Sequence, residues 1–148
     1  TVGGKLVIDA KQDELCTIAN TRPIHADPMY NLHGGAVAMG WPTVEEWIPM
    51  VAPVYEDLAT KLGDGPFFAG EKPGYAEAYI FHNLDNHFAL AKAELTAAVS
   101  AEAMGKLEAF YSRFAALDGI REYLAERPTT WGMPGSVANP STSWPTRT

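Results

Sequence analysis

The sequence predicts an all-α protein, a helical bundle of about four or five helices with an irregular arm at each end. Apolar residues recur at three- and four-residue spacing in three stretches, which begin near residues 43, 74 and 100. Helix-start signals precede these stretches, and segments rich in Gly and Pro separate them. By contrast, only residues 4–10 (GKLVIDA) alternate in the manner of a short β-strand.

Residues 1–42 are predicted to form an irregular N-terminal arm. The stretch KQDELCTIAN, residues 11–20, fits a helical turn or two. Pro and Gly then recur too often over residues 20–42 for regular structure, so we expect an ordered loop there.

The first long helix is predicted to start at Thr43. Thr43 and Glu46 have the spacing of a capping box, in which each side chain accepts a hydrogen bond from the backbone of the other residue. Pro49 and Pro53 each remove a helical donor, which predicts a kink or a break into two helices. Gly63 then supplies a left-handed stop. The apolar stripe of this helix consists of Val44, Trp47, Ile48, Val51, Tyr55, Leu58 and Leu62.

The stretch GDGPFFAGEKPG, residues 63–74, predicts a tight corner that leads into a central helix. Gly74 stands at the N-cap and Glu77 at the third helical position, where its carboxylate can accept from the Gly74 amide and oppose the helix dipole. The helix is predicted to run to Ala91. Because it is apolar on most sides, we expect other helices to enclose it.

Two further helices are predicted after residue 100. The first starts near Ser100, and a short one follows with Asp118 as its cap and ends at Arg127–Pro128. We expect the core to be formed by the inward-facing residues of these helices and of the central helix: Phe81, Leu84, Phe88, Leu107, Phe110, Phe114, Leu117, Ile120 and Tyr123.

Residues 129–148 are predicted to form an extended tail rich in Pro, Ser and Thr, because their Pro and Gly residues cannot continue a helix. Residues 43–128 then form the folded domain. Trp offers a large contact area for few rotatable bonds, and proline limits the entropy lost when an extended segment is bound. We therefore predict that both arms bind other protein subunits, with the candidate interface residues Trp41, Trp131, Met133 and Trp144. The alternative is that both arms fold back and cover the apolar surface of the bundle itself.

The composition is that of one ordinary globular domain, with 148 residues, 47% apolar residues and a net charge of −7. This acidic balance argues against a nucleic-acid partner and against a polybasic membrane anchor. No uncharged apolar run reaches the roughly eighteen residues of a membrane span, so no transmembrane segment is predicted. We expect a soluble protein of the cytoplasm or of an organelle, with the plastid stroma as one such compartment.

Two segments resemble the C-terminal all-helical domain of cytosolic glutathione transferases. GPFFAGEKPGYAEAYIF, from Gly65, is similar to the segment that enters the central helix of that domain. LEAFYSRFAALDGIREYLAERP, residues 107–128, is similar to a segment near the C-terminus of the family, most like the mu and sigma classes. The resemblance covers residues 53–128, about half of the chain. It implies a helical-bundle fold.

The sequence departs from the family pattern at the helix cap and at the N-terminal side. Gly74 and Glu77 stand where the family has Ser or Thr and then Asp. The resemblance implies that thiol activation belongs to a thioredoxin-like N-terminal domain, which supplies a Tyr, Ser or Cys. No such domain is recognisable before Thr43.

Structural roles are favoured for the side chains that suggest thiol chemistry. Tyr30 or Tyr75 could act as a thiol-activating phenol, but a hydrogen-bonded aromatic of the core or of a loop is the commoner role of Tyr. Cys16 has no His or other base at a motif-like position, so we expect a buried thiol rather than a nucleophile.

Metal and anion sites are not predicted either. His82 and His87 are five residues apart on one helix, about 500° around its axis, so they cannot form a two-His site with Asp85. Arg113 is expected to make an ion pair or to cap a carbonyl rather than to bind an anion. We predict no catalytic residue, no metal and no cofactor.

Two functions remain open. In the first, the chain is a non-catalytic transferase-like module that scaffolds a larger assembly, with organellar and photosynthetic complexes among the assemblies considered. In the second, it is the substrate-pocket half of a glutathione transferase, and glutathione would then be its cosubstrate. The lack of a recognisable thiol-activating domain favours the first.

Overall fold

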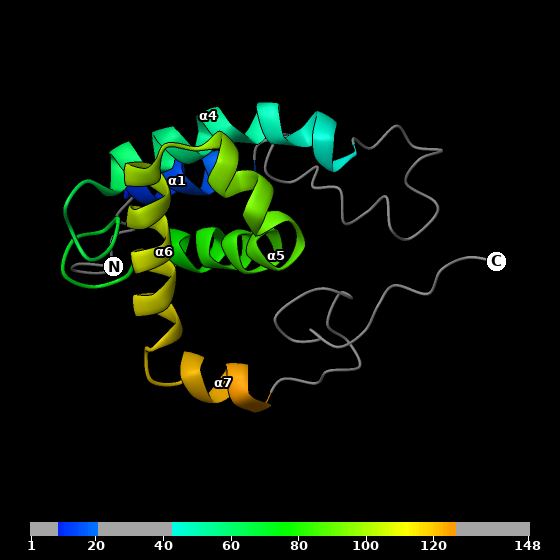
Figure 1. Ribbon diagram of the computed structural model, residues 1–148. Coiled ribbons are helices and arrows are strands. Elements are labelled where there is room, and N and C mark those ends of the chain that lie inside the picture. Colours follow the sequence, from blue (N-terminus) through cyan, green and yellow to red (C-terminus); the bar gives the residue numbers. More distant parts are fainter. Residues whose placement is uncertain (1–8, 21–42, 127–148) are drawn as a thin grey trace.

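The described parts of the chain consist mainly of the helices α1 (Ala10–Ala19), α4 (Val44–Leu62), α5 (Tyr75–Ala98), α6 (Ala101–Ala115) and α7 (Ile120–Glu126). The computed structural model describes residues 9–20 and 43–126 (Figure 1). Within these ranges no strand is present, and Phe67 and Gly70 form an isolated β-bridge in the corner before α5. The prediction of an all-α fold is confirmed.

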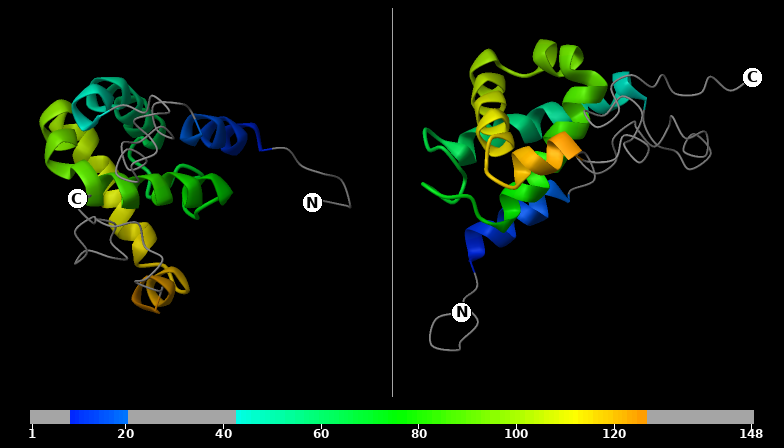
Figure 2. Two further views of the ribbon diagram at one scale, coloured as in Figure 1. Left: turned by 90° about the vertical axis from the view of Figure 1, so that its right-hand side faces the viewer. Right: turned by 90° about the horizontal axis from the view of Figure 1, so that it is seen from below.

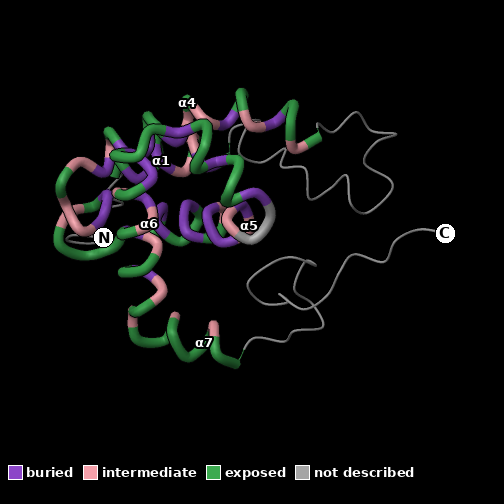
Figure 3. Tube along the Cα trace, in the orientation of Figure 1, coloured by how far each residue is buried: buried purple, intermediate pink, exposed green. Residues whose placement is uncertain are grey.

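Helix α5 is the central helix of the bundle. Helices α1, α4 and α6 each pack against it, α4 also contacts α6, and α7 packs on α6. Figure 2 shows α1 and α6 on opposite sides of α5. The buried residues accordingly follow α5 and the inner sides of α4 and α6, whereas α7 is exposed or half-buried (Figure 3).

Aromatic rings fill the contact between the corner, α5 and α6. The Phe110 ring lies edge-on to Phe67 and Phe68, with centroid distances of 6.4 and 5.1 Å. Phe81 stacks on Phe114 at 4.8 Å. Such pairs contribute about 0.5–1.5 kcal/mol each beyond the burial of their area. The aromatic pair of the corner is therefore part of the core and fixes the entry to α5.

Most of the predicted core residues lie inside the molecule. Phe81, Leu84, Leu107, Phe110 and Phe114 are buried, and Phe88, Leu117 and Ile120 are half-buried against the core. Tyr123 was wrongly assigned to the core, because its side chain is 59% exposed. Helix α7 has seven residues and packs mainly on α6. The side of α7 with Ile120 and Leu124 faces the core, and Tyr123 lies away from it.

Helix α4 continues through both of its prolines. The capping box at its start is present, with the Thr43 amide donating to Glu46 at 2.9 Å and the Glu46 amide donating to the Thr43 hydroxyl at 3.3 Å. The predicted break into two helices does not occur. Pro49 and Pro53 both lie on the exposed side, where water can bond the carbonyls that lose their helical donors. The buried side, with Trp47 and Tyr55 fully enclosed, holds the helix in place.

Local signals also place the ends of α4, α5 and α6. Gly63 ends α4 with a positive φ of 64°, as predicted. Helix α5 extends beyond the predicted end, but Ala91 departs from helical geometry (φ −147°, ψ 36°), so the break falls at the predicted last residue. Ser100 caps α6 by accepting from the Ala103 amide at 3.2 Å. The predicted cap of α7 is wrong, because Asp118 bonds Arg121 and the Gly119 amide donates to Glu122 instead.

Part of the predicted irregular N-terminal arm is a helix of the bundle. Helix α1 starts at Asp9, whose side chain accepts from the Gln12 amide, and it buries Gln12, Leu15 and Ala19. A helical turn or two was predicted for residues 11–20, and these residues form most of α1, but the short apolar stripe did not predict that this helix packs in the core. Leu15 and Ala19 belong to the main core.

Several predictions fall outside the described residues. These are the loop over 20–42 apart from Asn20, the tail over 129–148, and the roles of Tyr30, Trp41, Trp131, Met133 and Trp144. Among the described helices, none has the length and apolar character that crossing a membrane requires.

Candidate functional site

Glu77 connects the corner to the start of α5 by hydrogen bonds. Its side chain is fully buried, and its two carboxylate oxygens accept from the Gly74 amide at 2.9 Å and from the Ala69 amide at 2.7 Å. On the other side of the corner, Arg113 of α6 donates from Nε to the Pro66 carbonyl at 3.1 Å. The expected carbonyl contact of Arg113 is thus observed. Together the two side chains hold residues 66–74 between α5 and α6.

Gln12 of α1 supplies the acceptor that Gly74 lacks. Its Oε1 accepts from the Ala76 amide at 2.9 Å, which is the bond that an N-cap Ser or Thr would make. A Cβ added to Gly74 would lie 2.2 Å from Gln12 Oε1, so a Ser or Thr cannot occupy this position while Gln12 is in place. Sequence reasoning missed this role of Gln12. The only sequence signal for this role was that the following helix has Glu at its third position but lacks a capping side chain at its start.

The amide nitrogen of Gln12 is buried in the same contact. Gln12 is 2% exposed, and its Nε2 has no hydrogen-bond partner among the described residues. A second contact between α1 and α5 is made by Asn83, which donates to the Ala19 carbonyl at 2.9 Å. Helix α1 is therefore fixed to α5 at both of its ends.

Two polar pairs are buried between the helices. His87 is fully buried, with its Nδ1 3.0 Å from the Tyr55 hydroxyl and its ring edge-on to Trp47 at 4.7 Å. Asp85 accepts from the Tyr111 hydroxyl at 2.8 Å. These pairs connect α5 to α4 on one side and to α6 on the other.

The three residues weighed for metal binding face different partners. His82 lies on the exposed side of α5, with its Nε2 3.1 Å from the Asn86 amide, while Asp85 and His87 bond tyrosines of two other helices. Within residues 9–20 and 43–126, no three His, Cys, Asp or Glu side chains are grouped so that they could hold a metal ion.

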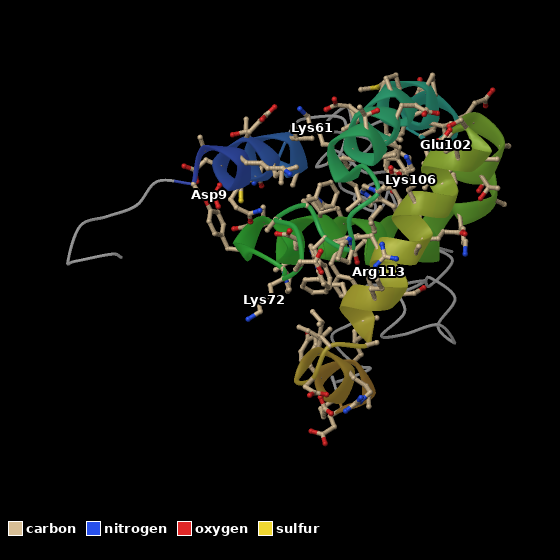
Figure 4. The ribbon with its side chains drawn as sticks, turned by 90° about the vertical axis from the view of Figure 1, so that its left-hand side faces the viewer. Asp9, Lys61, Lys72, Glu102, Lys106 and Arg113 are labelled. Carbon is tan, nitrogen blue, oxygen red and sulfur yellow. The ribbon has the colours of Figure 1, made fainter. Side chains whose placement is uncertain are left out.

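A groove of about 440 Å³ runs between the corner at residues 62–65 and the outer side of α6. Lys106 Nζ lies in it, 3.1 Å from Glu102 and 3.5 Å from Asp64. Figure 4 looks onto this side of the molecule, with Glu102, Lys106 and Arg113 following one another along α6. The groove thus has an acidic end, a lysine and an arginine.

Comparison with known families matches residues 36–127 to the family described as glutathione S-transferase, C-terminal domain. This chain belongs to that family. Comparisons with curated proteins and with solved structures find no match. Of the two segments that resemble the transferases in sequence, the one at the corner lies within the matched range, and the one along α6 and α7 does so up to Arg127.

Tyr75 does not have the properties of a thiol-activating phenol. Tyr75 is half-exposed and donates its hydroxyl to the Asp13 carboxylate, and this bond, with smaller contributions from burial and charge, raises the pKa of Tyr75 to about 12. Activation of a thiol requires a phenol that ionises more easily than usual, so the shift has the wrong direction.

The pKa of Cys16 is shifted in the same direction as that of Tyr75. Burial, and then the charges of Asp13 and Glu77, raise the pKa of the Cys16 thiol. Nucleophilic cysteines require a lowered pKa, since the thiolate is the reactive form. We assign no glutathione-binding residue within the described part of the chain. Tyr75 is hydrogen-bonded, as predicted, but it lies exposed at the first position of α5 rather than in the core or in a loop, and Cys16 is only half-buried.

Proposed function

We propose that this chain is a non-catalytic glutathione S-transferase C-terminal domain that serves as a structural module of a larger assembly. The observation that supports it is the state of Tyr75 and Cys16, the two described residues that were considered for thiol chemistry. Tyr75 and Cys16 both hold their protons more tightly than in free solution. Neither of these two side chains would then favour the thiolate, which glutathione conjugation requires.

The helical domain is suited to act as a rigid base for such an assembly. Helix α5 is enclosed by three other helices, and Glu77, Gln12 and Arg113 fix its entry. In the proposal, other protein subunits bind the two terminal arms, where Trp41, Trp131, Met133 and Trp144 provide contact area.

An assay of the purified chain with glutathione and an electrophilic aryl halide tests the absence of catalysis. We expect no turnover above the uncatalysed rate, whereas an active two-domain transferase in the same assay gives a clear signal. Turnover by the chain that is removed by Tyr75→Phe or by Cys16→Ser would overturn the proposal.

Deletion of residues 129–148 tests the role of the C-terminal arm. We expect the melting temperature of the isolated chain to stay unchanged while co-purification with other subunits from the source cells is lost. A large fall in melting temperature with association intact contradicts this role, because the tail would then stabilise the domain itself.

A second function is favoured by the family match, whose description is that of one domain of a transferase. In it, the chain is the substrate-pocket half of an enzyme. The full transcript distinguishes the two: an encoded thioredoxin-like domain upstream supports the enzyme, and its absence supports the structural module.

A further inference from the structure

Helix α1 contributes little apolar surface to the bundle and is held largely by polar contacts. Among the described residues, two of the 22 buried apolar side chains belong to α1, Leu15 and Ala19. At the start of α1, Gln12 accepts from the Ala76 amide, and at its end Asn83 donates to the Ala19 carbonyl. Most of the core therefore lies outside α1, in α4, α5, α6 and the corner.

Two further contacts of α1 lie at the surface. Tyr75 donates its hydroxyl to Asp13, and both residues are exposed. Lys61 Nζ of α4 lies 2.7 Å from Glu14, whose side chain is 57% exposed. Water can solvate these four groups when they separate, so such contacts contribute little to holding two helices together.

The contact between α1 and α5 leaves one buried donor of α1 without a partner. Gln12 is 2% exposed, and its Nε2 has no hydrogen-bond partner among the described residues. A buried donor of this kind lacks the hydrogen bonds to water that it makes when it is exposed. When α1 leaves α5, water reaches Nε2, and this offsets part of the free energy that opening requires.

We propose that α1 is a strap that opens as one unit while α4, α5 and α6 stay folded. Figure 2 shows α1 on the side of α5 opposite to α6, and the contacts of α4, α5 and α6 with one another do not pass through α1. The open state is rare, at most about one molecule in a hundred, because Leu15 leaves the core when α1 departs.

Opening uncovers an apolar strip that α1 covers in the closed state. Ala19 lies next to Ile80 and Leu84 of α5 and to Leu58 of α4, which form this strip. These three side chains are at most 2% exposed while α1 is in place. Helix α1 therefore controls access to the strip, in the manner of an autoinhibitory contact.

Amide hydrogen exchange of the full chain, followed residue by residue by NMR, tests the proposal. We expect the amides of α1 beyond its first turn to share one protection factor, of about 10²–10⁴. The amides in the middle of α6 should be protected at least about tenfold more, since they exchange only when the bundle unfolds. Urea should speed their exchange steeply and that of α1 weakly, because the opening of α1 exposes little surface.

Two variants that each remove one cap acceptor separate the opening of the strap from unfolding of the bundle. Ser100→Ala removes a bond that remains when α1 opens. It should speed exchange in α6 by about twofold to thirtyfold and leave exchange in α1 unchanged. Gln12→Ala removes a bond that exists only while α1 is closed. It should therefore speed exchange in both helices.

Three results would overturn the proposal. Equal protection of α1 and α6 in the wild-type chain would show that α1 separates only when the whole bundle unfolds. An equal acceleration of exchange in both helices by Ser100→Ala would show the same. Exchange confined to the first turn of α1, with the Cys16 and Thr17 amides as protected as those of α6, would show fraying of the helix end instead.

Discussion

Tyr75 donates its hydroxyl to the Asp13 carboxylate at the surface between α5 and α1. This bond stabilises the protonated phenol, which raises the pKa of Tyr75 from 10.0 to about 12. Below pH 10 the phenol is protonated in the folded and in the unfolded chain, so the contribution of the bond to stability is fully present. Between pH 10 and 12 the unfolded chain releases the proton first, and the contribution is lost as the pH rises through the folded value.

We therefore predict that Tyr75 ionises late in the folded chain, near pH 12. The ultraviolet absorbance of tyrosinate during an alkaline titration measures this step. Tyr75→Phe should lower the late absorbance change by the share of one tyrosine, whereas Tyr79→Phe, at an equally exposed position, should leave it in place. A late absorbance change of the same size in Tyr75→Phe would show that Tyr75 is not responsible for it.

At the scale of the elements, α1 completes the start of α5. Gln12 accepts from the Ala76 amide and occupies the space that a side chain at Gly74 would need. A capping side chain at position 74 and the glutamine at position 12 therefore compete for the same space, and one fits only if the other moves. Each arrangement satisfies the same backbone donor, so the two residues are energetically coupled.

A double-mutant cycle measures this coupling. Gly74→Ser alone should destabilise the chain by about 1–3 kcal/mol through overpacking against Gln12. Gln12→Ala alone should lose about 0.5–2 kcal/mol with the cap acceptor. In Gln12→Ala/Gly74→Ser the serine has room and can itself cap α5, so the double variant should lose clearly less than the two single losses combined. Urea unfolding gives the values, and simple additivity would contradict the contact.

The elements that the sequence predicted well are those whose signals are local. The capping box at Thr43, the stop at Gly63 and the start at Ser100 each depend on residues within one or two turns. The tolerance of Pro49 and Pro53 could not be predicted in this way, because it depends on which side of α4 faces solvent. The burial of Tyr123 was wrong for the same reason.

The candidate site was predictable only in part. Glu77 as the cap of α5 and Arg113 as a carbonyl partner follow from their positions in helices. The contact of Gln12 with Gly74 joins residues that are far apart in the chain, and α1 has too sparse an apolar stripe to suggest that it packs on α5. The groove beside α6 likewise depends on the corner and the helix lying next to each other.

At the scale of the whole molecule, the folded unit extends beyond the range of the family match. The match begins at residue 36, whereas α1 lies at residues 10–19 and buries Leu15 and Ala19 in the main core. It is also bonded to α4, with Lys61 Nζ 2.7 Å from Glu14. A domain cut to the matched range would lose a layer of its core and the acceptor for the start of α5.

We predict that the free energy of unfolding of a chain of residues 36–148 is lower than that of a chain of residues 9–148 by at least about 3 kcal/mol. The loss of one buried leucine, Leu15, already accounts for a difference of this size. Thermal and urea unfolding of the two chains measure the difference. The longer chain keeps all described contacts of α1 and should show a single cooperative transition. Equal stability of the two chains would mean that α1 is dispensable.

The exclusion between Gln12 and a side chain at position 74 also restricts how this sequence can change over generations. A single substitution that restores Ser or Thr at position 74 meets Gln12, and a single substitution that shortens Gln12 leaves the start of α5 without its acceptor. Either path between the two arrangements passes through an intermediate that is less stable than both ends. Relatives of this chain should therefore carry one arrangement or the other, and the residues at positions 12 and 74 should be inherited as a pair.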